Sequence, residues 1–151
     1  MSELAELFRY NAWANAIVLE TAEPSADRAV HETLSHLVGV EAIYTLMIRG
    51  EAPGEGSDRV AYMARPNVDF VREAARLAVE YQRLLTKVNM EEPVAIPWFP
   101  FRPNTRQALL QVLTHSAQHR SQLAMQLEAL GVVVPNFDYI TMVGKELIPP
   151  A

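Results

Sequence analysis

The distribution of proline and glycine most constrains the fold of this 151-residue chain. These residues interrupt helices, and here they gather mostly in short clusters that leave long segments between them. Within those segments, apolar residues recur every three or four positions, the spacing of a helix with one buried face. We therefore predict four helices: residues 3–22, a segment capped by Ser25 or Asp27 that runs to about Arg49, residues 67–89, and a segment from the cap Asn104 to Leu130.

Several of these helix ends carry specific signals. Asn104 is followed three residues later by Gln107, the spacing of a capping box. Gly131 stands where a left-handed residue ends the last helix, and Gly50 follows the cationic Arg49 at the end of the second.

The connections complete the predicted architecture. Residues 50–66 are rich in glycine and proline, and residues 90–103 contain four prolines, so both are predicted to be loops, the second with one short extended piece. The partly apolar tail after Gly131 is expected to pack back onto the helices. Four helices with one core-facing stripe each predict an all-α four-helix bundle, a single domain over residues 1–151.

Composition excludes several classes of function. The net charge is −5, with no run of Lys or Arg, so we expect no nucleic acid partner. The chain has no cysteine, so any bound metal must be held by histidine and carboxylate. No apolar run is long enough for a membrane span, and the N-terminal MSELAELFRY lacks the pattern of a signal peptide. We therefore expect a cytoplasmic protein without a membrane partner.

The stretch LTHSAQHRSQL places His115 and His119 four residues apart on the last predicted helix. At about 100° per residue the two side chains lie only about 40° apart, at the border between the apolar arc and the polar surface. A pair of metal ligands and a pair of partly exposed polar residues both fit this position. The spacing alone leaves the two alternatives open.

His36 supplies a possible third ligand. It lies on a largely apolar stripe of the second helix with Thr33, Val40, Ile43 and Met47. A lone histidine there is ordinarily a core residue hydrogen-bonded to a neighbour. An imidazole from this helix and a pair from the last helix can also converge in the interior of a bundle, where metal sites are commonly built.

His31 is not expected to be a ligand. The stretch HETLSH resembles the start of an H-E-x-x-H motif, but Ser35 occupies the position of its second histidine. The step of five residues instead turns His31 about 140° away from His36. Glu32, about 40° from His36, is a conceivable acid–base group.

Three neutral imidazoles suit zinc, nickel, copper or ferrous iron and leave a coordination position for water or substrate. Such an ion lowers the pKa of a bound water or thiol, and its affinity falls at low pH because the ligands must be deprotonated. Gln122 and Glu128 are either residues that support the site or exposed polar side chains. The chain has no GxSxG, P-loop, GxGxxG or Glu-x-x-His motif, and no catalytic residue is identified.

The whole pattern resembles the DinB family (the DinB/YfiT-like proteins). The segments that resemble the family are YNAWAN, LSHLVGVEAIYTLMIRGE, the last-helix pattern H-x3-H-R-x-Q and the closing G…P…DY. The resemblance implies an up-down-down-up four-helix bundle, often a homodimer, with one divalent metal on His36, His115 and His119. For the ion we expect zinc or nickel, with iron or copper as alternatives.

The resemblance also implies a function. Members of the family include transferases and isomerases that use low-molecular-weight thiols such as bacillithiol and mycothiol, so the expected substrate is a small molecule. A metal-dependent hydrolase is the other enzymatic possibility. A metal- or ligand-binding bundle without turnover, and a structural bundle with vestigial histidines, are the alternatives.

Overall fold

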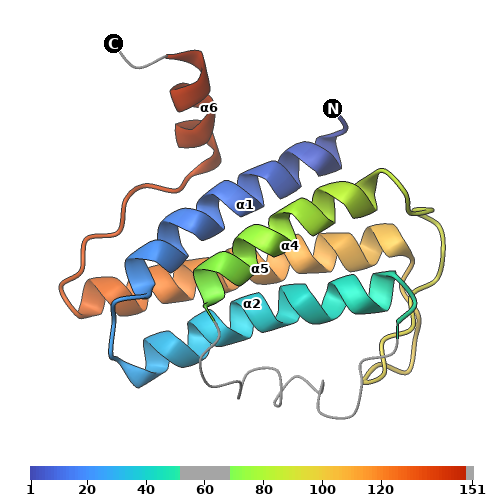
Figure 1. The fold of residues 1–151 in the computed structure, drawn as a ribbon, viewed down its shortest axis with the longest axis horizontal. Coiled ribbons are helices and arrows are strands. Elements are labelled where there is room, and N and C mark those ends of the chain that lie inside the picture. Colours follow the sequence, from blue (N-terminus) through green and yellow to red (C-terminus); the bar gives the residue numbers. More distant parts are fainter. Residues whose placement is uncertain (52–68, 149–151) are drawn as a thin grey trace.

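The computed structural model describes residues 1–51 and 69–148 (Figure 1). Over these residues the chain is all-helical, with five helices and no strand. The helices are α1 (Glu3–Ala22), α2 (Arg28–Ile48), α4 (Phe70–Leu85), α5 (Thr105–Ala129) and α6 (Tyr139–Leu147). The predictions for the first, second and fourth long helices are confirmed, with ends that differ by no more than one residue.

Local capping chemistry explains where these helices begin and end. Asn104 accepts a hydrogen bond from the backbone N–H of Gln107, whose side chain accepts one from the backbone N–H of Asn104, so the predicted capping box is present. Asp27, rather than Ser25, caps α2. Gly50 and Gly131 have φ angles of 72° and 79°, a conformation that glycine adopts without steric cost.

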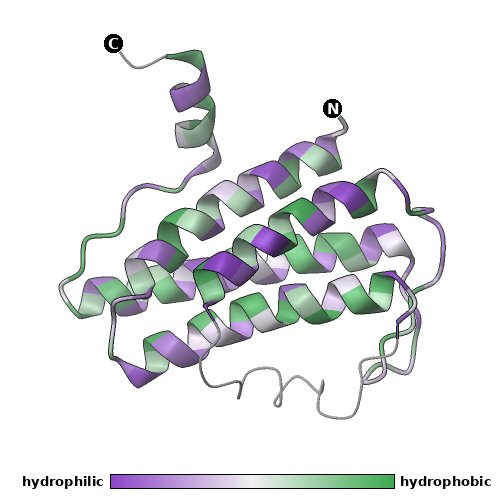
Figure 2. Cartoon of the chain, viewed as in Figure 1, coloured by the Kyte–Doolittle hydropathy of each residue, from purple (hydrophilic) through white to green (hydrophobic). Residues whose placement is uncertain are grey.

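The four long helices pack around a hydrophobic core, which consists of two clusters of buried side chains. α2 packs against α5 and α4, and α1 packs against α4 and α5. Their buried side chains form two hydrophobic clusters. The first is centred on Val18, Leu37, Leu77 and Leu127. The second is centred on Phe8, Ile43, Tyr81 and Leu109. Figure 2 shows the resulting alternation, with hydrophobic and hydrophilic stretches sharing each long helix.

The third predicted helix is shorter than expected. α4 begins at Phe70 after the cap Asp69 and ends at Leu85 rather than residue 89. At this end the Thr86 hydroxyl and backbone N–H both bond to the carbonyl of Arg83, and the N–H groups of Lys87 and Val88 both bond to the carbonyl of Leu84. Residues 67 and 68, and residues 52–66 of the predicted loop, lie outside the described residues.

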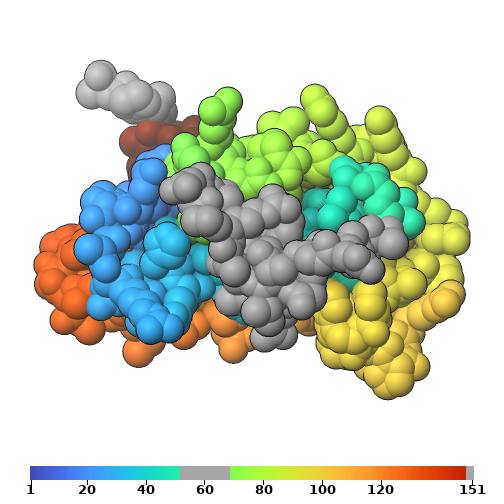
Figure 3. All heavy atoms as spheres, turned by 60° about the horizontal axis from the view of Figure 1, so that its bottom comes forward, coloured from blue at the N-terminus to red at the C-terminus, as the bar shows by residue number. Residues whose placement is uncertain are grey.

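The proline-rich connection 90–103 contains the short extended piece that the sequence predicts. The Val94 N–H donates to the carbonyl of Pro103 at 2.7 Å, next to an isolated bridge between Pro93 and Asn104. In the space-filling view this connection (yellow) lies beside the C-terminal end of α2 (teal) (Figure 3).

The tail forms a helix that the sequence did not predict. α6 contacts α1, and its Met142 is buried, so the tail does pack back as expected. Glu146 pairs with Arg9, and the Tyr139 ring meets the Tyr10 ring edge to face at 5.6 Å. Along the described segments, no helix combines the length and apolar character that crossing a bilayer requires.

Candidate metal centre

Three histidine side chains converge between α2 and α5. His36 projects from α2, and His115 and His119 project from α5. The Nε2 atoms of His36 and His115 lie 3.0 Å apart, and the three possible ligand atoms all lie within 4.8 Å of one another. The ring centroids are separated by 4.3 to 4.8 Å. The structure therefore brings together the three histidines that the sequence singled out.

The packing of α2 against α5 brings these rings together. His115 and His119 are one turn apart on α5, so both imidazoles leave the helix on one side. His36 faces them from the adjacent helix, in line with its predicted inward stripe. All three side chains are half-buried, which matches the predicted border position of His115 and His119, whereas His36 is less buried than its apolar stripe predicted.

The distances suit a metal bound by nitrogen. Zinc–imidazole bonds of about 2.0–2.1 Å in a tetrahedron place the nitrogens roughly 3.3–3.4 Å apart. The spacing of the three imidazoles brackets that value, with 3.0 Å between His36 and His115 and 4.8 Å as the upper limit for all three. Small side-chain rotations would therefore bring three donors around one ion, and this donor set suits zinc, nickel, copper or ferrous iron.

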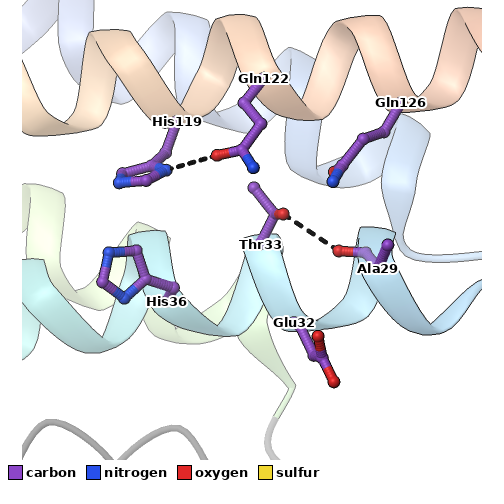
Figure 4. A pocket seen from close by; sticks show the side chains of 7 residues that line it. All are labelled: Ala29, Glu32, Thr33, His36, His119, Gln122 and Gln126. Carbon is purple, nitrogen blue, oxygen red and sulfur yellow. Dashed lines mark hydrogen bonds between the residues drawn. The ribbon is translucent and has the colours of Figure 1, made fainter.

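Gln122 orients one imidazole. Its Oε1 lies 2.8 Å from Nδ1 of His119, so the ring Nδ1–H donates to the amide oxygen and the lone pair falls on Nε2 (Figure 4). Of the two side chains proposed from sequence to support the site, Gln122 thus makes the contact, whereas Glu128 is exposed on α5.

A pocket of about 450 Å³ opens beside His36 and His119. Figure 4 shows the other side chains of its lining, which are Ala29, Glu32, Thr33, Gln122 and Gln126. Gln126 Oε1 is buried without a hydrogen-bond partner among the described residues. The lining is therefore mostly polar near the imidazoles, with Gln122 and Gln126 on α5 and Glu32 and Thr33 on α2.

Glu32 and His31 do not join the three imidazoles. The carboxylate of Glu32 pairs with Arg28 at 2.7 Å and points away from His36 in Figure 4, a placement that does not support the acid–base role considered for it. His31 is exposed, and its ring meets Phe70 edge to face at 5.6 Å, which confirms that it lies outside the cluster.

Sequence reasoning missed a buried polar network beside the histidines. Glu41 is 2% exposed, and its Oε1 accepts hydrogen bonds from Asn11 Nδ2 (2.8 Å), Asn15 Nδ2 (2.8 Å) and Ser116 Oγ (2.6 Å). Arg120 Nη1 donates to the side-chain oxygens of both asparagines. The only signals in the sequence were a carboxylate within an apolar helix and two asparagines four residues apart.

Neighbouring side chains partly compensate the cost of burying the charge of Arg120. Burial lowers the pKa of the Arg120 guanidinium, while the nearby Tyr10 and Glu41 raise it. The guanidinium lies 5.5 Å from the centre of the Tyr10 ring. The Tyr81 hydroxyl donates to the backbone carbonyl of Glu41 at 2.6 Å, and burial raises the pKa of Tyr81 well above its usual value, which keeps it a donor.

Comparison with known proteins identifies the family. The family model described as DinB matches residues 1–146, a span that includes the three histidines, the four long helices and all of α6 except Leu147. Neither the curated proteins nor the solved structures contain a match. With nearly its whole length covered by that one model, the chain belongs to the DinB family.

Proposed function

We propose that this protein binds one divalent metal ion on His36, His115 and His119 and uses it in a metal-dependent reaction. The observation that carries the proposal is the convergence of three imidazoles from two helices within 4.8 Å. Zinc or nickel is the expected ion, with iron or copper as alternatives, because imidazole nitrogen suits all four. Three protein ligands leave a position for substrate, as in catalytic zinc sites.

We infer that α1, α2, α4 and α5 form the up-down-down-up four-helix bundle that is typical of the family. The support is the shared core of these helices and their course in Figure 1, where α1 and α5 run opposite to α2 and α4. A homodimer and a cytoplasmic location complete the proposal. Light scattering coupled to size-exclusion chromatography tests the dimer.

The proposed activity is S-transfer from a low-molecular-weight thiol. When bound, a divalent ion lowers the pKa of a thiol at the open coordination position. The thiol sulfur would form a bond to an electrophilic carbon of a second small molecule, while a halide leaves or an epoxide ring opens. The pocket beside His36 and His119 provides room for the rest of the substrate.

A thiol-transfer assay tests this activity. The metal-loaded protein is incubated with a panel of low-molecular-weight thiols and a chlorinated or epoxide electrophile, and thioether formation is followed by mass spectrometry. We expect a rate well above that of the His115→Ala variant, since the variant lacks one of the three imidazoles. Stoichiometric metal in the wild type with no rate above this control would favour the alternative, a metal- or ligand-binding bundle without turnover.

Replacing Gln122 with alanine should weaken metal binding about tenfold, because the hydrogen bond that holds the His119 ring is lost. Isothermal titration with Zn²⁺ measures the change. Gln118→Ala removes an exposed amide from the same helix and is expected to leave the affinity unchanged. Equal affinities for the two variants would show that Gln122 does not orient the ligand.

A further inference from the structure

The buried network around Glu41 occupies the same level of the molecule as the three histidines. Along α1, Asn11 and Asn15 lie between Phe8 of one hydrophobic cluster and Val18 of the other. Along α5, Ser116 and Arg120 lie between Val112 and Leu123 in the same way. His115 and His119 directly precede these two residues in the chain. The core therefore contains one polar layer that includes both the network and the imidazoles.

The network connects α2 and α5, the two helices that carry the three clustered imidazoles, and also includes α1. Glu41 of α2 accepts from Ser116 of α5 at 2.6 Å and from both asparagines of α1. Arg120 of α5 closes the cycle by donating to the same two asparagines, at 2.9 Å for Asn15. Each asparagine thus bonds to the carboxylate with its amide nitrogen and to the guanidinium with its amide oxygen. A rotation of α5 against α2 that moves Ser116 by more than a few tenths of an ångström would weaken its 2.6 Å bond to Glu41.

Such a network is poorly explained by stability alone. Burying a carboxylate and a guanidinium costs several kcal/mol per ion in desolvation, and apolar residues of similar volume frequently stabilise a core as well or better. A satisfied polar network in a core instead favours one arrangement of the helices over alternatives in which its bonds are lost.

A metal site needs that kind of restriction. A rotation of α5 by about 10° moves an imidazole nitrogen, roughly 6 Å from the helix axis, by about 1 Å. Metal–ligand distances tolerate errors of only about 0.2 Å. Hydrophobic packing is non-directional, so it restricts such a rotation less sharply than directional hydrogen bonds do.

We infer that Asn11, Asn15, Glu41, Ser116 and Arg120 are positioning residues, which fix the rotation and height of α5 against α2 and thereby place His115 and His119 opposite His36. The role of this network in metal binding rests on the proposed function, that is, on a metal bound by the three histidines. The geometry of the network belongs to the metal-free protein as well, because the network consists of protein groups alone.

The test compares two network variants with two matched controls. Ser116→Ala removes one hydroxyl from α5, and Glu41→Gln keeps the volume of the side chain but removes its charge. Thr45→Val removes a buried hydroxyl that donates to the carbonyl of Ala42 in its own helix. Leu77→Ala opens a cavity in the core from α4, which carries neither network residue nor histidine.

Two readouts separate positioning from general stability. The first is the nuclear Overhauser effect between the rings of His36 and His115 in the metal-free protein, which reports their contact. The second is Co²⁺ titration, followed by the visible absorption bands that depend on ligand geometry. Melting temperatures of all four variants are recorded in parallel.

We expect both network variants to weaken the ring-to-ring effect, to raise the Kd for Co²⁺ tenfold or more, and to shift the absorption bands. Leu77→Ala should lower the melting temperature at least as much as the network variants do. Both controls should nevertheless retain the wild-type Co²⁺ absorption bands and a Kd for Co²⁺ within twofold of wild type. Network variants that retain the ring contact and the wild-type Kd would overturn the inference. If the wild type binds no Co²⁺, the proposed metal function fails, and the ring contact in the metal-free variants alone decides the positioning role.

Discussion

Replacing His115 with alanine should raise the Kd for zinc by more than about a hundredfold, because the loss of a group that merely supports a ligand already costs ten- to hundredfold. The variant retains only His36 and His119 from the cluster. Competition with a chromophoric chelator measures the affinity. Circular dichroism should show unchanged helix content, since the His115 side chain is only half-buried.

His31→Ala is the matched control for this substitution. It removes an imidazole of the same chemistry from an exposed position outside the cluster. We expect its zinc affinity to equal that of the wild type. Equal losses in the two variants would mean that zinc binds at dispersed histidines rather than at the site between α2 and α5.

Replacing Glu41 with alanine should lower the free energy of unfolding by about 3–5 kcal/mol. The substitution leaves the buried guanidinium of Arg120 without a counter-charge and removes the acceptor that three side chains share. Urea denaturation in the presence of a chelator measures the effect without any contribution from metal.

Glu32→Ala provides the comparison, because it removes a carboxylate whose partner Arg28 is exposed. Exposed ion pairs contribute about 0–1 kcal/mol, so this variant should be nearly as stable as the wild type. A similar small loss for Glu41→Ala would mean that the carboxylate does not compensate the charge of Arg120.

Helix positions were predictable from the sequence because their signals are local. Asn104 and Gln107 interact across three residues, and Gly131 adopts its left-handed conformation next to the helix that it ends. The end of α4 was predicted four residues too late, because the sequence after Leu85 has no glycine or proline to mark the end before Pro93. α6 was missed because its nine residues carry no capping hydrogen bond from Asp138 and only Met142 is buried.

The candidate ligands were also predictable, since a helix face follows directly from residue spacing. Their mutual approach was not, because it depends on how α2 packs against α5. The role of Glu41 shows the limit most clearly. The sequence places a carboxylate on a largely apolar helix, whereas its partners come from positions 26 to 75 residues away in the chain. The loop predicted at residues 50–66 lies mostly outside the described residues.

The most direct test of the central claim is elemental analysis of the untagged protein after purification, combined with thermal melting before and after chelation. We expect one divalent ion per chain and a lower melting temperature once the ion is removed, because a ligand that binds only the folded state stabilises it by about 2.7 kcal/mol at a hundredfold excess over Kd. Absence of stoichiometric metal, together with a melting temperature that chelation does not change, would contradict the assignment of His36, His115 and His119 as a metal site.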